Sequence, residues 1–336
     1  MGVKLTDLLI KKQISFQDLE GKKIAIDASN MLYQFLSSIR QSDGTPLKDS
    51  QGNITSHLVG TFNRLSNLMS KNIRLAVVFD GKMPLLKIKT QEEREYRKQI
   101  AEKKLQQARE EEDIEDMHKY SKQTTRLTKD MTEETKELLK AMGIPVVNAP
   151  AESDAQISFM AEQGDVWAIA SSDRDCLVYG APRIITNLTL SQRRKLPSGV
   201  SVKTTPELID LKETLAHLKI NQDQLLVIAI LTGTDYNING VKGIGPKTAL
   251  KLVHQYKDFD VLFKEVKADF NWKEIYAVFK SMPIMKNYQL KWNSVDVEKV
   301  KEILVEKHDF SLERVEKILK NITHRKKDQS GLQKFF

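Results

Sequence analysis

Short runs of apolar residues, many of them β-branched, recur through the first 186 residues, and stretches with helical periodicity separate most of them. Apolar runs of this length without polar alternation are typical of strands that are covered on both faces. Strands that alternate with helices predict an α/β fold, in which a mainly parallel central sheet is flanked by helices on both faces. The predicted strands are 23–26, 75–79, 145–147, 166–170 and 183–186, and the predicted helices among them include 29–39, 56–71, 133–142 and 155–163.

A long charged segment interrupts this alternation. Residues 82–130 are rich in Glu, Lys, Arg and Gln and poor in large apolar residues, so their helix propensity is high but their apolar stripe is thin. Taken alone, such a segment is most simply a solvated helix or a coiled-coil arm. It is long for a crossover between neighbouring strands, and we expect an inserted, exposed helical element. From residue 221 onward the pattern is helical, and a flexible tail is expected over 328–336.

Acidic residues follow three of the predicted strands where each strand ends. Asp27 and Asp80 close two of the runs, and Asp173 follows a third, with Asp175 two residues later. Ligands of open α/β sheets bind at the carboxyl ends of the strands, and neighbouring strands lie only about 4.8 Å apart. We therefore expect these side chains to converge in one crevice. Any one of them alone is more simply a turn residue or a helix N-cap.

Three further acidic residues could join this crevice. Glu152 and Asp154 lie at the start of a predicted helix, and Asp235 follows the apolar helical stretch 225–231. Seven carboxylates in one pocket would repel one another strongly unless cations neutralised them. A pair of Mg²⁺ ions would do so, and would suit a phosphodiester substrate. The single cysteine, Cys176, excludes a disulfide framework and a cysteine zinc site, so the expected metal is a hard cation held by carboxylates.

The charge balance bears on the class of partner. A net charge of +8 and an isoelectric point near 9.2 favour a polyanion, either a nucleic acid or an anionic membrane surface. The densest apolar run is far too short to span a bilayer, and the N-terminal segment lacks the apolar stretch of a signal peptide. We therefore expect neither a membrane-spanning nor an exported protein.

Five acidic blocks resemble, in order, those of the flap endonuclease family. They read Ile-Asp-Ala-Ser-Asn, Val-Phe-Asp-Gly-Lys, Ala-Pro-Ala-Glu-Ser-Asp-Ala-Gln, Ser-Ser-Asp-Arg-Asp-Cys-Leu and Gly-Thr-Asp-Tyr-Asn. With the segment Gly-Val-Lys-Gly-Ile-Gly-Pro-Lys-Thr-Ala and the C-terminal tail, the resemblance covers nearly the whole chain. It implies a single 5′-nuclease domain over 1–327, of PIN-like fold. The implied activity is cleavage at the base of 5′ flaps in DNA replication and repair, together with 5′–3′ exonuclease activity.

The resemblance also implies roles for individual residues. Lys87 and Arg94 would clamp the scissile phosphate electrostatically, although without the resemblance they are simply charges on a solvated helix. Tyr33 would stack on a base, or else packs against the sheet. Gly2 would be a free N-terminus near the active site. The segment 82–130 would be a helical arch that admits a single-stranded flap and excludes duplex. Two Mg²⁺ ions, with Mn²⁺ as a substitute, would be held directly or through water by Asp27, Asp80, Glu152, Asp154, Asp173, Asp175 and Asp235.

A glycine-rich turn lies between two predicted helices near residue 245. Its glycines allow backbone N–H groups to approach a phosphate closely, and a helix that begins near Pro246 favours the anion. The segment resembles the family's helix–two-turn–helix element over 225–260, which binds duplex backbone and usually a monovalent cation. A simple glycine-capped helix junction is the alternative. The residues expected to contact DNA here are Lys242, Gly243, Gly245 and Lys247.

The tail over 328–336 resembles a sliding-clamp-binding motif, which implies PCNA as a partner. Exposed terminal aromatics of this kind usually mark a binding site for another protein. The residues that would bind the clamp are Gln329, Leu332, Phe335 and Phe336. Relatives often carry Glu where Asp154 stands and Pro where Met83 stands. The chain ends at this motif without a long basic extension, and we expect an archaeal, cytoplasmic protein that is monomeric alone.

Two other hypotheses remain open at the level of the sequence. One is a relative that prefers bubbles or four-way junctions, against which the long charged insertion and the clamp motif argue. The other is a non-catalytic, clamp-tethered DNA-binding protein. That hypothesis gives no reason for acidic residues at strand ends.

Overall fold

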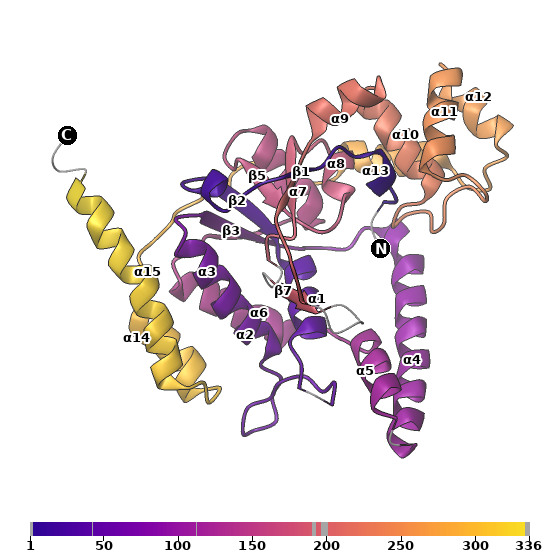
Figure 1. Ribbon diagram of the computed structural model, residues 1–336. Coiled ribbons are helices and arrows are strands. Elements are labelled where there is room, and N and C mark those ends of the chain that lie inside the picture. The colour runs from indigo at the N-terminus through magenta and orange to yellow at the C-terminus, as the bar shows by residue number, and fades with distance from the viewer. Residues whose placement is uncertain (1–2, 42, 112, 190–192, 196–200, 333–336) are drawn as a thin grey trace.

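The computed structural model describes residues 3–41, 43–111, 113–189, 193–195 and 201–332. A seven-stranded sheet runs through its centre in the order β1-β9-β6-β5-β2-β3-β4 (Figure 1). The strands are β1 (Lys12–Gln13), β2 (Lys23–Asp27), β3 (Arg74–Phe79), β4 (Val146–Asn148), β5 (Ala168–Ala170), β6 (Arg183–Thr186) and β9 (Glu207–Asp210). A separate antiparallel pair is formed by β7 (Arg193–Lys195) and β8 (Ser201–Lys203).

Five consecutive strands, from β4 at one edge through β3, β2 and β5 to β6, are all parallel, whereas β9 pairs antiparallel with both β6 and β1. These five are the strands predicted from the sequence, and their ends differ from the prediction by at most two residues. The expected α/β fold with a mainly parallel sheet is confirmed. The sequence did not predict β1, β7, β8 or β9.

Helices cover both faces of the sheet and create two cores. Along β2, Ala25 packs into one core, while Ile24 and Ile26 pack into the other, as alternation along a strand requires. One face carries α1 (Ala28–Ser38), α2 (Ser56–Gly60), the π-helical turn η3 (Thr61–Leu65), α3 (Ser66–Met69), α6 (Lys129–Ala141), α14 (Val297–Lys301), η5 (Glu302–Glu306) and α15 (Leu312–Leu332). The other carries α7 (Ser153–Glu162), α8 (Asp175–Val178), α9 (Leu211–Leu218), α10 (Gln222–Thr232), α11 (Pro246–Gln255), α12 (Phe259–Glu265) and α13 (Trp272–Ser281).

The helix α10 is the most buried element on its face. Every residue from Leu225 to Thr232 is buried, so this helix is apolar all round rather than amphipathic. The Asn221 side chain caps it by accepting from the Gln224 backbone N–H, and the Gln224 side chain accepts from the Asn221 backbone N–H, which completes a capping box. A fixed and buried α10 holds the turn that follows it in a defined position.

The charged segment 82–130 forms the 3₁₀ turn η4 (Leu85–Lys87) and two helices, α4 (Ile88–Glu110) and α5 (Ile114–Gln123). The two helices pack on each other and extend away from the sheet (Figure 1). Few α4 side chains are buried, among them Ala101, Leu105 and Ala108. The thin apolar stripe in the sequence therefore corresponds to a helix that contacts little besides its partner α5.

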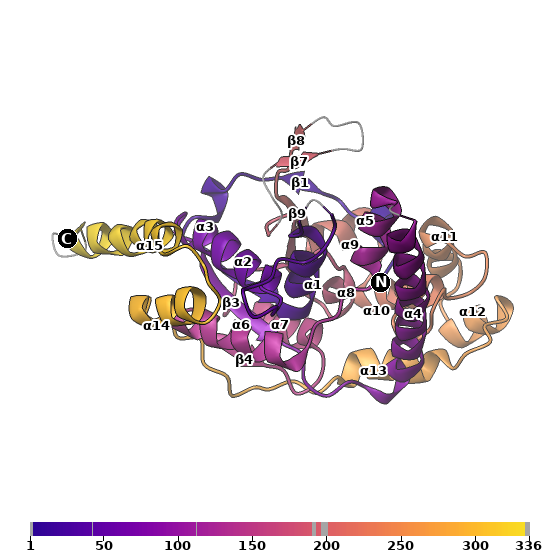
Figure 2. The ribbon, with the colours of Figure 1, turned by 90° about the horizontal axis from the view of Figure 1, so that it is seen from below.

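The helix α15 lies at the end of the molecule opposite to α4 (Figure 2). It runs to Leu332, five residues into the segment 328–336. The prediction of a flexible tail is wrong for residues 328–332, because no proline or glycine precedes Gly331 to end a helix that is rich in Lys, Arg and Glu. Residues 333–336 lie outside the described part of the chain. No described helix combines the length and apolar character that crossing a membrane requires.

Candidate active site

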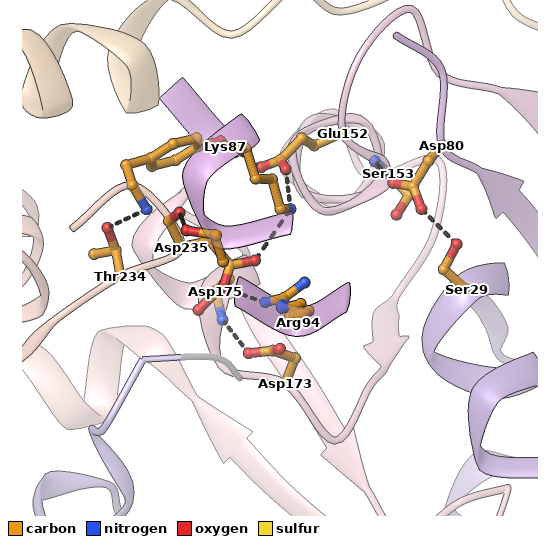
Figure 3. Close-up of polar contacts among 12 residues, drawn as sticks. Ser29, Asp80, Lys87, Arg94, Glu152, Ser153, Asp173, Asp175, Thr234 and Asp235 are labelled. Carbon is orange, nitrogen blue, oxygen red and sulfur yellow. Dashed lines mark hydrogen bonds and ion pairs between the residues drawn. The ribbon is translucent and has the colours of Figure 1, made fainter. Parts of the chain in front are cut away.

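One cleft, of about 680 Å³, opens at the carboxyl ends of the central strands. Its acidic lining comes from β2, from the segments that follow β3 and β5, from the first turns of α7 and α8, and from the turn after α10 (Figure 3). The structure thus brings together all seven predicted carboxylates, namely Asp27, Asp80, Glu152, Asp154, Asp173, Asp175 and Asp235. Since β5, β2 and β3 are adjacent, three of these residues come from neighbouring strands, as expected.

Hydrogen bonds from two serines position the carboxylates at this edge. Asp27 caps α1 by accepting from the Ser29 backbone N–H at 2.9 Å. The Ser29 hydroxyl donates to Asp80 at 2.5 Å, and the Ser153 backbone N–H donates to the other oxygen of Asp80 at 2.8 Å (Figure 3). The Ser153 hydroxyl donates to Asp27 at 3.1 Å. Helix starts therefore supply the donors that keep two neighbouring carboxylates in place.

Close backbone packing next to Asp80 requires a glycine. A Cβ atom at Gly81 would lie 2.1 Å from the carbonyl oxygen of Ala149, so no larger residue fits without a backbone shift. The N–H of Gly81 donates to the carbonyl of Ala151 at 2.6 Å. The segments after β3 and β4 are thereby held together, and the acidic residues on both face the same cleft.

Three of the carboxyls hold their protons unusually strongly. Burial, together with the charge of Asp80, raises the pKa of Asp27 to about 7. Burial and the charge of Asp27 raise the pKa of Asp154, and burial and the charge of Asp173 raise the pKa of Asp175. The cleft therefore contains more negative charge than its own positive groups neutralise.

Two basic side chains of the insertion form ion pairs with carboxylates of the cleft. Lys87 forms ion pairs with Glu152 and, at 3.1 Å, with Asp235, and Arg94 pairs with Asp235 at 2.5 Å (Figure 3). Burial opposes the charge on Lys87, but the two carboxylates prevail and raise the pKa of its amine. In turn, Lys87 and Arg94 overcome the effect of burial and lower the pKa of Asp235. Thr90 also donates to the backbone carbonyl of Asp235 at 2.5 Å, which fixes the base of α4 against this turn.

The donor set suits a hard divalent cation, because it consists of carboxylate oxygens in a site with excess negative charge. In the described part of the chain, however, no three acidic, histidine or cysteine side chains already surround a common metal position. Lys87 and Arg94 occupy Glu152 and Asp235, and serine donors occupy Asp27 and Asp80. Cation binding therefore requires these carboxylates to exchange their present partners for the ion.

Several residues that contact the carboxylates of the cleft were not predicted from the sequence. Glu152 accepts hydrogen bonds from the hydroxyls of Tyr236 at 2.5 Å and Tyr179 at 3.1 Å, and the Cys176 thiol lies 2.9 Å from a carboxylate oxygen of Asp154. Ser29 and Ser153, described above, were also missed. The only sequence signal for Tyr236 and Cys176 is that each directly follows a predicted acidic residue.

The remaining predicted residues lie outside the carboxylate cluster or at its rim. Tyr33 lines the cleft, is 40% exposed, and has the Lys98 ammonium 5.5 Å from its ring centre. Lys242, Gly243 and Gly245 are exposed on the turn between α10 and α11, and Lys247 is exposed in the first turn of α11. Gly243 has a φ of +82°, which a glycine adopts readily. Gln329 and Leu332 lie in the last turns of α15, whereas Gly2, Phe335 and Phe336 lie outside the described residues.

Comparison with known proteins gives consistent matches over the whole chain. Residues 1–101 match the XPG N-terminal domain, and residues 143–235 match the XPG I-region. The chain is 45% identical over 349 residues to Flap endonuclease 1 of Staphylothermus marinus, and the match covers 100% of both proteins.

Solved structures agree with these matches. The flap endonuclease-1 from Methanococcus jannaschii superposes with a TM-score of 0.76 at 44% identity, covering 96% of this chain and 98% of that one. The catalytic core of Rad2 in complex with a DNA substrate has a TM-score of 0.73 at 23% identity, covering 96% and 100%, which shows the shared fold alone. From the identity and coverage of its relatives, the chain belongs to the flap endonuclease 1 family.

Proposed function

We propose that this protein is a structure-specific 5′ flap endonuclease, with 5′–3′ exonuclease activity, that acts in the maturation of replicated DNA and in repair. The observation that carries the proposal is the single cleft in which seven carboxylates meet Lys87 and Arg94. Relatives named as flap endonucleases, at 44–45% identity over nearly the whole chain, support the choice of substrate.

The family uses divalent metal ions, and the carboxylate donor set fits them. We expect two Mg²⁺ ions, with Mn²⁺ as a substitute, held directly or through water by the seven carboxylates of the cleft. Ions bound there would activate a water molecule and stabilise the charge that develops on the scissile phosphate. The shorter side chain of Asp154 favours a contact through water, and the Cys176 thiol beside it fixes its orientation.

The chain's own basic groups complete the site. When cations neutralise Glu152 and Asp235, Lys87 and Arg94 lose their present partners and become available to the phosphate. There they stabilise negative charge that grows in the transition state. Hydrolysis leaves a 5′-phosphate on the product. Tyr33, exposed at the rim, offers an aromatic face on which a base next to the scissile bond can stack.

Selection by shape follows from the position of the insertion. Gln91 and Lys98 on α4 and Gln123 at the end of α5 line the same cleft as the carboxylates. We propose that 82–130 is a helical arch, so that a strand reaches the carboxylates past these helices. A single strand would pass, and a duplex would be excluded by its width.

Contacts away from the cleft would hold the rest of the substrate and a partner. The exposed turn between α10 and α11, with Lys242 on it and Lys247 in the first turn of α11, would bind duplex backbone, with a monovalent cation bound at the turn. The segment 328–336 would bind a sliding clamp of the PCNA type. We expect the protein to be monomeric alone and to act in an archaeal cytoplasm.

A labelled 5′ flap substrate tests the assignment. With Mg²⁺ present, wild-type protein should cut at the base of the flap, and Asp173→Ala should lower the rate by at least about a hundredfold. Asp269→Ala, which removes an exposed aspartate outside the cleft, should cut normally.

Unchanged cleavage by Asp173→Ala would remove the site assignment. Tight binding of flaps without any wild-type cleavage would instead indicate a non-catalytic DNA-binding protein. Faster cleavage of bubbles or four-way junctions than of flaps would indicate the junction-specific relative.

A further inference from the structure

A second, smaller cavity lies beside the catalytic cleft. Its volume is about 130 Å³, enough for several water molecules and therefore for one phosphate group in their place. It shares Arg94, Arg97 and Asp235 with the cleft, which makes the two spaces neighbours. Its other walls are Lys4, the α4 residues Thr90 and Glu93, and the end of α10 with the turn that follows it. The base of α4 lies beside α10 and α11 in both ribbon views (Figures 1 and 2).

Of the three basic side chains that line this cavity, two form ion pairs with acidic residues. Arg94 is paired with Asp235 at 2.5 Å, and Arg97 is paired with Glu93 at 3.4 Å. Lys4 is exposed, and no acidic side chain of the described residues forms an ion pair with it. Lys4 therefore provides positive charge that no acidic side chain in the described part of the chain neutralises.

Two backbone N–H groups of residues that line the cavity also lack a hydrogen-bond partner among the described residues. Ile238 and Asn239 line the cavity, and within the described part of the chain their N–H groups have no acceptor. The surrounding turn is held rigidly: Asn237 accepts from the Thr234 backbone N–H at 3.1 Å and donates from its side chain to the carbonyl of Ile230 at 2.7 Å. A lysine and free N–H groups on a rigid turn are the donors that anion sites use.

The cavity also lies between the two parts of the proposed DNA-binding surface. On one side is the carboxylate cleft, and on the other Asn239 is followed directly by Gly240, where the glycine-rich turn begins. A strand that passes from the cleft to that turn must cross this cavity. Without Lys4, a phosphate here would face Glu93 and Asp235 with little positive charge to spare, since Arg94 and Arg97 are already paired.

We propose that this cavity binds one internucleotide phosphate of the cleaved strand, on the duplex side of the scissile bond, with Lys4 as its main charged ligand. The proposal rests on the proposed nuclease function and adds a subsite to it. Lys4 acts by holding the strand in register, because it touches a phosphate that does not react. Its removal should therefore weaken binding and leave the chemical step nearly intact.

Steady-state cleavage of a flap substrate gives the first measurement. Lys4→Ala should raise KM about tenfold with kcat nearly unchanged. The slope of the logarithm of the DNA-binding constant against the logarithm of the salt concentration should become less negative by about 0.9, the value for one lost phosphate contact. Lys4→Arg should retain most of the affinity. Lys212→Ala removes an exposed lysine on α9 and controls for the change in net charge.

Neutral phosphate analogues give the decisive measurement. A single methylphosphonate is placed, in turn, at each of the first few linkages on the duplex side of the scissile bond. At one position the substitution should weaken binding to wild-type protein and to Lys212→Ala about tenfold, but should have no further effect on Lys4→Ala. If Lys4→Ala and wild type lose the same factor at every position, the subsite does not exist. Normal cleavage of the unmodified flap by wild type separates that outcome from a failure of the nuclease proposal.

Discussion

Glu152 is surrounded by three donors from distant parts of the chain. Lys87 forms an ion pair with one carboxylate oxygen, while the hydroxyls of Tyr236 and Tyr179 donate to the other. If Lys87 moves to the phosphate when cations bind, the two tyrosines remain. They then fix the orientation of Glu152 as a ligand, in the way that hydrogen bonds from neighbouring residues commonly fix metal-binding carboxylates.

Removing one of these hydroxyls should weaken cation binding. In Tyr236→Phe a hydrogen bond to a charged group is lost, with a contribution of about 1.5–3 kcal/mol. We expect the Mg²⁺ concentration for half-maximal flap cleavage to rise about tenfold, while the rate at saturating Mg²⁺ changes little. Tyr276→Phe is the matched control, because it loses a hydrogen bond to Asp223 outside the cleft. An unchanged Mg²⁺ dependence in Tyr236→Phe would contradict the role assigned to this tyrosine.

The raised pKa of Asp27 predicts a pH dependence of stability. Its carboxyl titrates near pH 7 in the folded protein, against an ordinary value of 3.8. Between these values the folded state binds more protons at Asp27 than the unfolded state, so the contribution of Asp27 to stability is greatest below pH 4 and is lost as pH rises through 7.

In metal-free protein we expect the free energy of unfolding of wild type, relative to Asp27→Asn, to fall between pH 4 and pH 7. The slope should be at most about 1.4 kcal/mol per pH unit. Added Mg²⁺ should reduce the fall, because cations stabilise the ionised cleft. Denaturant titrations at several pH values measure it, and parallel curves for the two proteins would show that Asp27 does not titrate in this range.

The sequence predicted the carboxylates of the cleft but few of the residues that form hydrogen bonds with them. Each predicted carboxylate stands at a strand end or a helix start, where pattern alone marks the position. Tyr179 and Tyr236 are separated by 57 residues, and only the packing of α8 against α10 brings their hydroxyls within 3.3 Å. No local pattern encodes such a pair.

Among the elements, Arg40 links three segments through one half-buried guanidinium. It donates to the carbonyl of Leu36 at the end of α1 at 3.0 Å and to the carbonyl of Gly44 at 2.8 Å. It also donates to the hydroxyls of Ser121, in α5, and Thr125, the latter at 2.6 Å. The second helix of the insertion is thereby anchored to the nuclease core at its C-terminal end.

Loss of this anchor should loosen α5. In Arg40→Ala we expect faster amide hydrogen exchange over residues 113–125 and slower flap cleavage, by about tenfold. Arg40→Lys should recover only part of the activity, because an ammonium cannot reproduce the planar fork of donors. Arg74→Ala, an exposed arginine at the start of β3, serves as the control. Exchange that is equally slow in Arg40→Ala and wild type would show that α5 is held by other contacts.

The strands that the sequence did not predict are short or contain charged residues. β1 has two residues, both exposed, and β9 reads Glu-Leu-Ile-Asp, with one buried side chain. Neither carries the apolar run that marked the five parallel strands, because both lie toward one side of the sheet, where β1 forms its edge. β9 is placed by pairing with β6, and β1 is placed by pairing with β9; both are long-range contacts that the local sequence does not report.

For the whole molecule, the charge distribution predicts how DNA affinity responds to salt. The net charge is +8 although the cleft is strongly acidic, so positive charge is concentrated elsewhere, including Lys242 on the turn after α10 and Lys247 in the first turn of α11. If about four phosphates are held, affinity should fall about a hundredfold between about 50 and 200 mM salt.

Fluorescence anisotropy with a labelled flap and no divalent ion measures this affinity. In the double variant of Lys242→Ala and Lys247→Ala, the slope of log K against log salt should become less negative by about 2. Lys212→Ala should leave that slope as in wild type. A flat salt response in wild type would exclude a grip based on backbone phosphates.

The helix α15 places the last described residues at the end of the molecule that lies away from α4 (Figures 1 and 2). Residues of α4 line the cleft, and no described residue of α15 does. A sliding clamp that binds beyond this helix would leave the opening of the cleft unobstructed. An enzyme retained in this way stays close to successive substrates, and the search for each becomes intramolecular. High effective concentration can then replace high intrinsic affinity for the DNA substrate. Fast product release is then possible while the enzyme stays tethered near the DNA.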